Sequence, residues 1–67
     1  MNPNRTMWII NEHVGVDGDE REARRYMGIL ADWIDEGGYD PDWDIYPAAT
    51  KAFREFRYGP DRFFKIF

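Results

Sequence analysis

Apolar residues recur along the chain with two different spacings, and each spacing predicts a different secondary structure. The first apolar stretch, residues 6–14, opens with β-branched and aromatic residues and is followed by Gly15. Residues of these types are enriched in strands, and glycine commonly follows a strand. The stretch therefore predicts a β-strand in which Trp8, Ile10 and Val14 share one face.

The next stretch has helical spacing. Asp17 and Asp19 each precede a glutamate by three residues, which resembles the capping box that begins a helix, and Gly37-Gly38 suits a left-handed cap at its end. Between these signals, apolar residues are three or four positions apart, as on one face of an amphipathic helix: Ala23, Tyr26, Met27, Leu30, Trp33 and Ile34. We predict one long amphipathic helix over about residues 19–36.

A second helix is predicted over residues 48–57. Pro47 suits its first position, because the N–H that proline lacks has no partner in the first turn of a helix. One side of this helix carries apolar residues and the opposite side carries basic ones: Ala49, Ala52, Phe53 and Phe56 against Lys51, Arg54 and Arg57. The chain then passes Gly59-Pro60 to residues 62–67, which read as a terminal strand.

Residues 39–46 separate the two helices and contain Pro41 with three aspartates, so they predict a loop or, over residues 43–46, a very short strand. The expected order is strand, helix, acidic loop, helix, strand in a single domain, residues 1–67. This order predicts an α+β fold, a small two-layer domain with the long helix packed on a short sheet. Two strands alone are marginally stable, so either residues 43–46 add a third or a second chain extends the sheet through an edge strand.

Composition excludes several classes of function. The chain has one histidine, no cysteine and no serine, so it cannot assemble a Cys/His zinc site or a Ser-His-Asp or Cys-His nucleophile. The longest apolar run, Met7–Ile10, has four residues, whereas a membrane span needs about 20 and a signal-peptide core about 7–15. We expect a cytoplasmic protein that is not an enzyme and holds no cofactor or metal.

Charge is distributed unevenly along the chain. The net charge is −4, and residues 26–50 hold six acidic and no basic residues, whereas residues 51–67 hold five basic and two acidic ones. The six carboxylates are those of Asp32, Asp35, Glu36, Asp40, Asp42 and Asp44. Two interpretations stay open: ion pairs neutralise them, or they face solvent and meet a basic partner. The candidate ion-pair partners are Lys51, Arg54, Arg57 and Arg62.

Aromatic residues alternate with these carboxylates, so the segment could imitate the phosphates and bases of a nucleic acid. The predicted partner-binding residues are Asp32, Asp35, Glu36, Tyr39, Asp40, Asp42, Trp43 and Asp44. The hypothesis is a non-enzymatic inhibitor that blocks the basic groove of a nucleic-acid-handling protein and does not bind nucleic acid itself. In size, charge and lack of catalytic groups the chain resembles small phage-encoded inhibitors of CRISPR and restriction systems, without a shared motif.

Other interpretations use the same residues differently. The chain is a small accessory subunit or homodimer if apolar strand edges make the contact and the charges serve solubility alone. Asp40, Asp42 and Asp44 match the first ligands of a calcium loop, but Ile45 and Lys51 stand where such a loop needs glycine and glutamate. Apart from the carboxylates, His13 is the only plausible proton carrier for acid/base chemistry. Its position near the end of the first predicted strand favours a surface or packing role instead.

Overall fold

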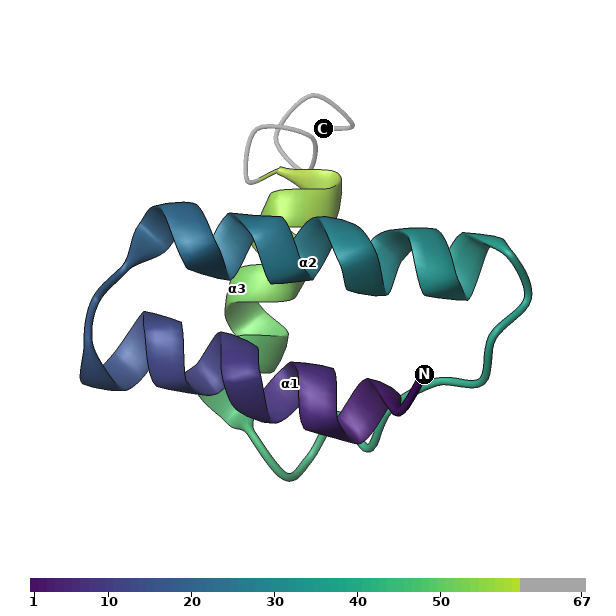
Figure 1. Cartoon of the computed structure of the whole chain (residues 1–67), viewed down its shortest axis with the longest axis horizontal. Coiled ribbons are helices and arrows are strands. Elements are labelled where there is room, and N and C mark those ends of the chain that lie inside the picture. Colours follow the sequence, from purple (N-terminus) through teal and green to yellow (C-terminus); the bar gives the residue numbers. More distant parts are fainter. Residues whose placement is uncertain (60–67) are drawn as a thin grey trace, which may run out of the picture.

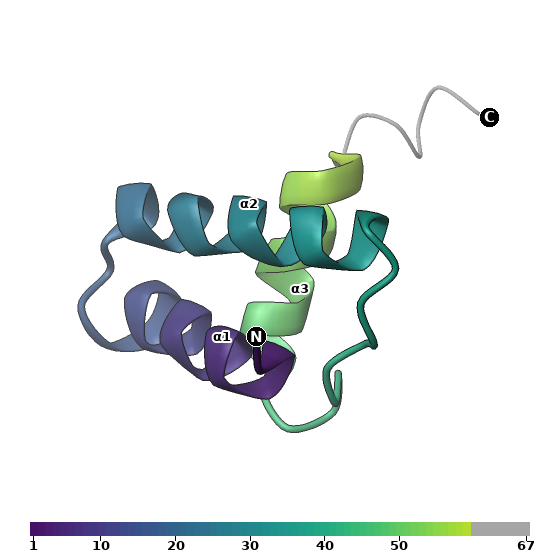
Figure 2. The ribbon, with the colours of Figure 1, turned by 45° about the vertical axis from the view of Figure 1, so that its right-hand side comes forward.

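Residues 1–59, the part of the chain that the computed structural model describes, fold into helices (Figure 1). The elements are α1 (Pro3–Asn11), the π-helix η1 (Glu12–Val16), α2 (Glu20–Asp35) and α3 (Pro47–Tyr58). α1 and α2 lie side by side, and α3 crosses both of them; the turned view shows the same arrangement (Figure 2). Within residues 1–59 there is no strand, so the predicted α+β fold with a sheet is wrong.

The N-terminal stretch is a helix rather than the predicted strand, and its start explains why. The side-chain oxygen of Asn2 accepts hydrogen bonds from the backbone N–H of Asn4 (3.0 Å) and of Arg5 (3.4 Å), and Pro3 occupies the first turn. A side-chain cap followed by proline is a strong local signal for a helix. It outweighs the strand preference of the β-branched and aromatic residues that follow.

The face predicted for that strand is also wrong. Ile10 is fully buried, but Trp8 is 47% exposed and Val14 is exposed as well. Residues two apart in a helix point about 200° away from each other, so Trp8 and Ile10 cannot share a face. The buried side instead pairs Met7 with Ile10, at a helical spacing of three.

The prediction for α2 is confirmed, with both ends within about one residue of the expected ones. The Asp19 carboxylate caps its first turn by accepting from the N–H of Glu22 at 3.2 Å. At the other end Gly37 has φ +94° and its N–H donates to the carbonyl of Ile34 at 3.0 Å, while the N–H of Gly38 donates to that of Trp33 at 2.9 Å. These two bonds form a Schellman cap, which needs a left-handed residue at the position of Gly37.

After α2, the predicted second helix is confirmed, whereas the predicted short strand before it is wrong. α3 begins at Pro47 as expected and ends at Tyr58, followed by the capping residue Gly59, whose φ is +72°. Residues 43–45 form a turn, and Tyr46 then precedes α3, so the very short strand expected over residues 43–46 is not formed. The predicted strand over residues 62–67 lies outside the described residues. Residues 1–59 contain no strand, so they offer no strand edge through which a homodimer could form.

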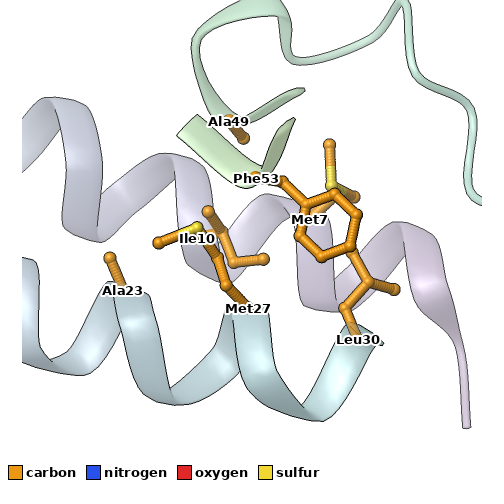
Figure 3. Close-up of a cluster of buried hydrophobic side chains, with 7 residues drawn as sticks. All are labelled: Met7, Ile10, Ala23, Met27, Leu30, Ala49 and Phe53. Atoms are coloured by element: carbon orange, nitrogen blue, oxygen red, sulfur yellow. The ribbon is translucent and has the colours of Figure 1, made fainter. Parts of the chain in front are cut away.

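The core is formed by all three α-helices (Figure 3). Its buried side chains are Met7 and Ile10 from α1, Ala23, Met27 and Leu30 from α2, and Ala49 and Phe53 from α3. The predicted apolar stripe of α2 faces this core, with three members buried and the others half-buried. Burying a large side chain of this kind stabilises a fold by about 1.5–3 kcal/mol, so these few residues supply much of the stability. In the part of the chain that is described, no helix combines the length and apolar character needed to cross a membrane.

Candidate acidic interaction surface

The six clustered carboxylates follow the last turns of α2 and the loop that leads to α3. All six residues are exposed; together with Tyr39 they are called the acidic surface below. In both ribbon views the loop leaves the end of α2 and passes the N-terminal end of α1 before it reaches α3 (Figures 1 and 2). The backbone that carries these residues thus runs from the end of α2 past the N-terminal end of α1 and on toward α3.

The first part of the loop is held by a tryptophan. The Trp33 indole N–H donates to the carbonyl of Tyr39 at 2.9 Å, and the two rings meet edge to face with centroids 5.7 Å apart. Gly38 lies against the same indole: a Cβ added there would stand 2.2 Å from Trp33 Cε2. The contact fixes the backbone at Tyr39 and leaves its side chain 61% exposed beside Asp40.

The middle of the loop is tied to α1. The N–H of Asp42 donates to the side-chain oxygen of Asn4 at 2.6 Å, and the preceding Pro41 is buried. The Asp42 carboxylate accepts from the N–H of Asp44 at 3.1 Å, which closes a local turn. Asp42 and Asp44 are therefore held close together with a defined backbone.

The last part of the loop is anchored on α3. As a result, Trp43 is not exposed like the other predicted partner-binding residues. Trp43 is half-buried and stacks on Phe53 with centroids 5.6 Å apart. Its carbonyl accepts from the Thr50 hydroxyl at 2.7 Å. Among the eight predicted partner-binding residues, Trp43 thus packs against the core, and the other seven are exposed.

Ion pairing neutralises only a small part of this surface among the described residues. Arg57 of α3 reaches back to the Asp35 carboxylate. The other five carboxylates have no ion-pair partner within residues 1–59, and Lys51 and Arg54 are exposed without forming one there. Arg62, the fourth expected partner, lies outside the described residues. Three of the acids also lie at the C-terminal end of α2, where the helix dipole already disfavours negative charge.

The alternative sites proposed from the sequence find little support in residues 1–59. They contain no group of three or more His, Cys, Asp or Glu residues placed to hold a metal ion, so the calcium-like spacing of Asp40, Asp42 and Asp44 does not form a metal site there. His13 lies at the far end of the helical pair, in η1. It stacks on Tyr26 with ring centroids 5.9 Å apart, so of the surface or packing role expected for it, the packing role describes its ring.

His13 also has an acidic neighbour that the sequence analysis did not identify. Its Nδ1 lies 3.0 Å from an Asp17 carboxylate oxygen. The N–H of Asp19, which donates to the same carboxylate at 2.9 Å, is the main cause that lowers the pKa of Asp17, and His13 lowers it further. The spacing of four residues between His13 and Asp17 signals this pair only if the segment is read as a helix.

Comparisons with protein-family models, with curated proteins and with solved structures gave no match to this chain. Its functional interpretation therefore depends on the residues and contacts described above.

Proposed function

We propose that the protein is a non-enzymatic binding protein whose acidic surface docks on the basic groove of a nucleic-acid-handling protein and blocks it. The observation that carries this proposal is that five exposed carboxylates have no ion-pair partner among the described residues. Carboxylates that are already paired would offer less negative charge to a basic partner, whereas these five, unpaired within residues 1–59, offer theirs in full.

The physical basis is competition for the same cations. A nucleic-acid-binding groove presents Lys and Arg at positions that meet phosphates. Carboxylates on adjacent helical turns and on a fixed loop present negative charges to those same side chains. Complementary charge also speeds the encounter and makes it depend on salt.

The anchored loop strengthens this proposal. Asn4, Trp33 and Thr50 hold its backbone at three successive points. A loop that is already ordered loses less conformational entropy on binding, and this raises affinity. The exposed ring of Tyr39 adds an aromatic contact next to the charges, and tyrosine is common among the residues that dominate interface energies.

Two triple variants with the same change in net charge test the proposal. The first, Asp32→Asn, Asp40→Asn and Asp44→Asn, removes three of the five carboxylates of the acidic surface that are unpaired in the described part of the chain, and leaves the Arg57 ion pair and the Asp42 turn in place. The control, Glu12→Gln, Glu20→Gln and Glu22→Gln, removes three acids from η1 and the first turn of α2. Each tagged protein is used to capture partners from lysate, with elution by a salt gradient or by short duplex DNA.

The wild type and the control should retain a nucleic-acid-binding protein that duplex DNA displaces, and the first variant should lose it. Circular dichroism checks that both variants remain helical. The proposal fails if the first variant retains the same partner, or if duplex DNA does not compete with the captured protein.

A further inference from the structure

A second candidate site lies at the end of α2 that is remote from the acidic surface. A groove of about 540 Å³ opens between η1, the first half of α2 and the last turns of α3. This volume falls in the range of about 300–1,000 Å³ that is usual for ligand sites. On α2 the groove extends as far as Met27, and the acidic surface begins five residues later at Asp32, about 7.5 Å further along the helix axis.

Five of the residues that line the groove are apolar. Ala23 and Met27 come from α2, Ala52 and Phe56 from α3, and Val14 from η1. The facing alanines leave space that larger side chains would fill. Phe56 remains 42% exposed, so part of its ring is accessible to an apolar group that enters the groove.

The charged residues of the groove are mainly acidic. On the α2 side, Arg24 is engaged by Glu20 at 3.0 Å. On the α3 side, Glu55 is exposed and has no ion-pair partner within residues 1–59. The described part of the groove thus offers an occupant one unmatched negative charge next to apolar surface.

We propose that this groove binds a segment of a partner protein in which a large apolar side chain is followed directly by lysine or arginine. The apolar side chain would lie against Phe56 and Met27, and the cation would meet the Glu55 carboxylate. An anionic segment would face that carboxylate unfavourably, and a neutral one would leave it without a partner. This proposal does not rest on the acidic surface, with which the groove shares no residue.

The test is an NMR titration of the full ¹⁵N-labelled chain with acetyl-Gly-Leu-Phe-Lys-Gly-amide. The matched control peptide has glutamate in place of the lysine. We expect saturable amide shifts at Ala23, Ala52 and Phe56, and about two- to fivefold tighter binding of the lysine peptide, which is the range for an exposed ion pair. The variant Glu55→Lys should reverse this preference, because its charge then favours the glutamate peptide.

Several outcomes would overturn the inference. These are the absence of saturable shifts at the groove, shifts confined to the acidic surface, and an unchanged peptide preference in Glu55→Lys. Shifts at the same groove amides on simple concentration of the free protein would identify a second copy as the occupant. Contacts in the free protein between the groove and residues 60–67 would identify the chain itself as the occupant, and either result would reject the partner segment.

Discussion

At the scale of single residues, the Trp33 indole determines how the acidic loop begins. It occupies the space beside Gly38, where an added Cβ would stand 2.2 Å from Cε2 of the ring. Gly38→Ala should therefore displace the ring, weaken its hydrogen bond to Tyr39 and lower the free energy of unfolding by about 1–3 kcal/mol. Urea denaturation measures this loss.

Gly28 provides the matched control for this substitution. It lies inside α2, and a Cβ there meets nothing within 4 Å. Gly28→Ala should stabilise the helix by about 0.5–1 kcal/mol, because alanine loses less conformational freedom on folding. Equal effects of the two substitutions would show that the indole does not pack against Gly38 in solution.

The Asp17 carboxylate leads to a prediction about pH. Its pKa lies below the ordinary value of 3.8 in the folded chain, mainly because it accepts the N–H of Asp19. A group with a lowered folded pKa stabilises the fold above its unfolded pKa, and this contribution disappears as the pH falls through the folded value. The wild type should therefore exceed Asp17→Asn in stability at neutral pH, and the difference should shrink below pH 3.8. Urea unfolding of both proteins at neutral pH and below pH 3.8 measures this difference in stability. A difference that is independent of pH would contradict the lowered pKa of Asp17.

At the scale of elements, α2 and α3 were predictable and α1 was not. The two predicted helices carry a long apolar period together with clear terminal signals, such as Gly37 and Pro47, and these signals agree with each other. In the first stretch, the β-branched and aromatic residues favour a strand locally, whereas the two residues that decide the outcome, Asn2 and Pro3, lie outside it. The error then affected the fold class, because this stretch was paired with the strand predicted over residues 62–67 to make a sheet.

The acidic surface and the groove also differ in how far the sequence predicts them. The run of charges in one contiguous segment was enough to identify the carboxylates of the acidic surface, but whether they face solvent or are neutralised by ion pairs was decided only by the structure. The inward position of Trp43 depends on Phe53 of α3, and the groove combines η1 with two helices. Contacts of this kind between distant segments leave no local spacing that a sequence pattern reveals.

The cap of α1 tests its helical structure directly. Asn2→Ala should lower the free energy of unfolding by about 0.5–2 kcal/mol, because the N–H groups of Asn4 and Arg5 lose their acceptor. Asn2→Asp keeps an acceptor at the same position and should retain most of the stability. Thermal unfolding by circular dichroism compares the three proteins, and an unchanged Asn2→Ala would argue against a cap at this residue.

At the scale of the whole molecule, the uneven distribution of charge should cost stability where the acidic surface lies. Asp32 belongs to the last turn of α2, which the helix dipole makes negative, and its acidic neighbours repel it. Glu20 and Glu22 lie in the first turn of the same helix, where the dipole favours them, and they also face Arg24 and Arg25. Removal of acids at the two ends should therefore have opposite effects on the fold.

The two triple variants designed above measure this difference. Asp32→Asn, Asp40→Asn and Asp44→Asn should raise the free energy of unfolding by about 0.3–1 kcal/mol at low salt, whereas Glu12→Gln, Glu20→Gln and Glu22→Gln should lower it by a similar amount. Both differences should fade near 1 M salt, where screening acts within about 3 Å. Urea unfolding of the wild type and both variants at low salt and at 1 M salt measures these differences. A gain in the first variant would mean that the chain keeps acids that its own fold does not need, as expected for a surface that serves a partner. A loss there would mean that those acids stabilise the fold itself, and the case for a binding role would weaken.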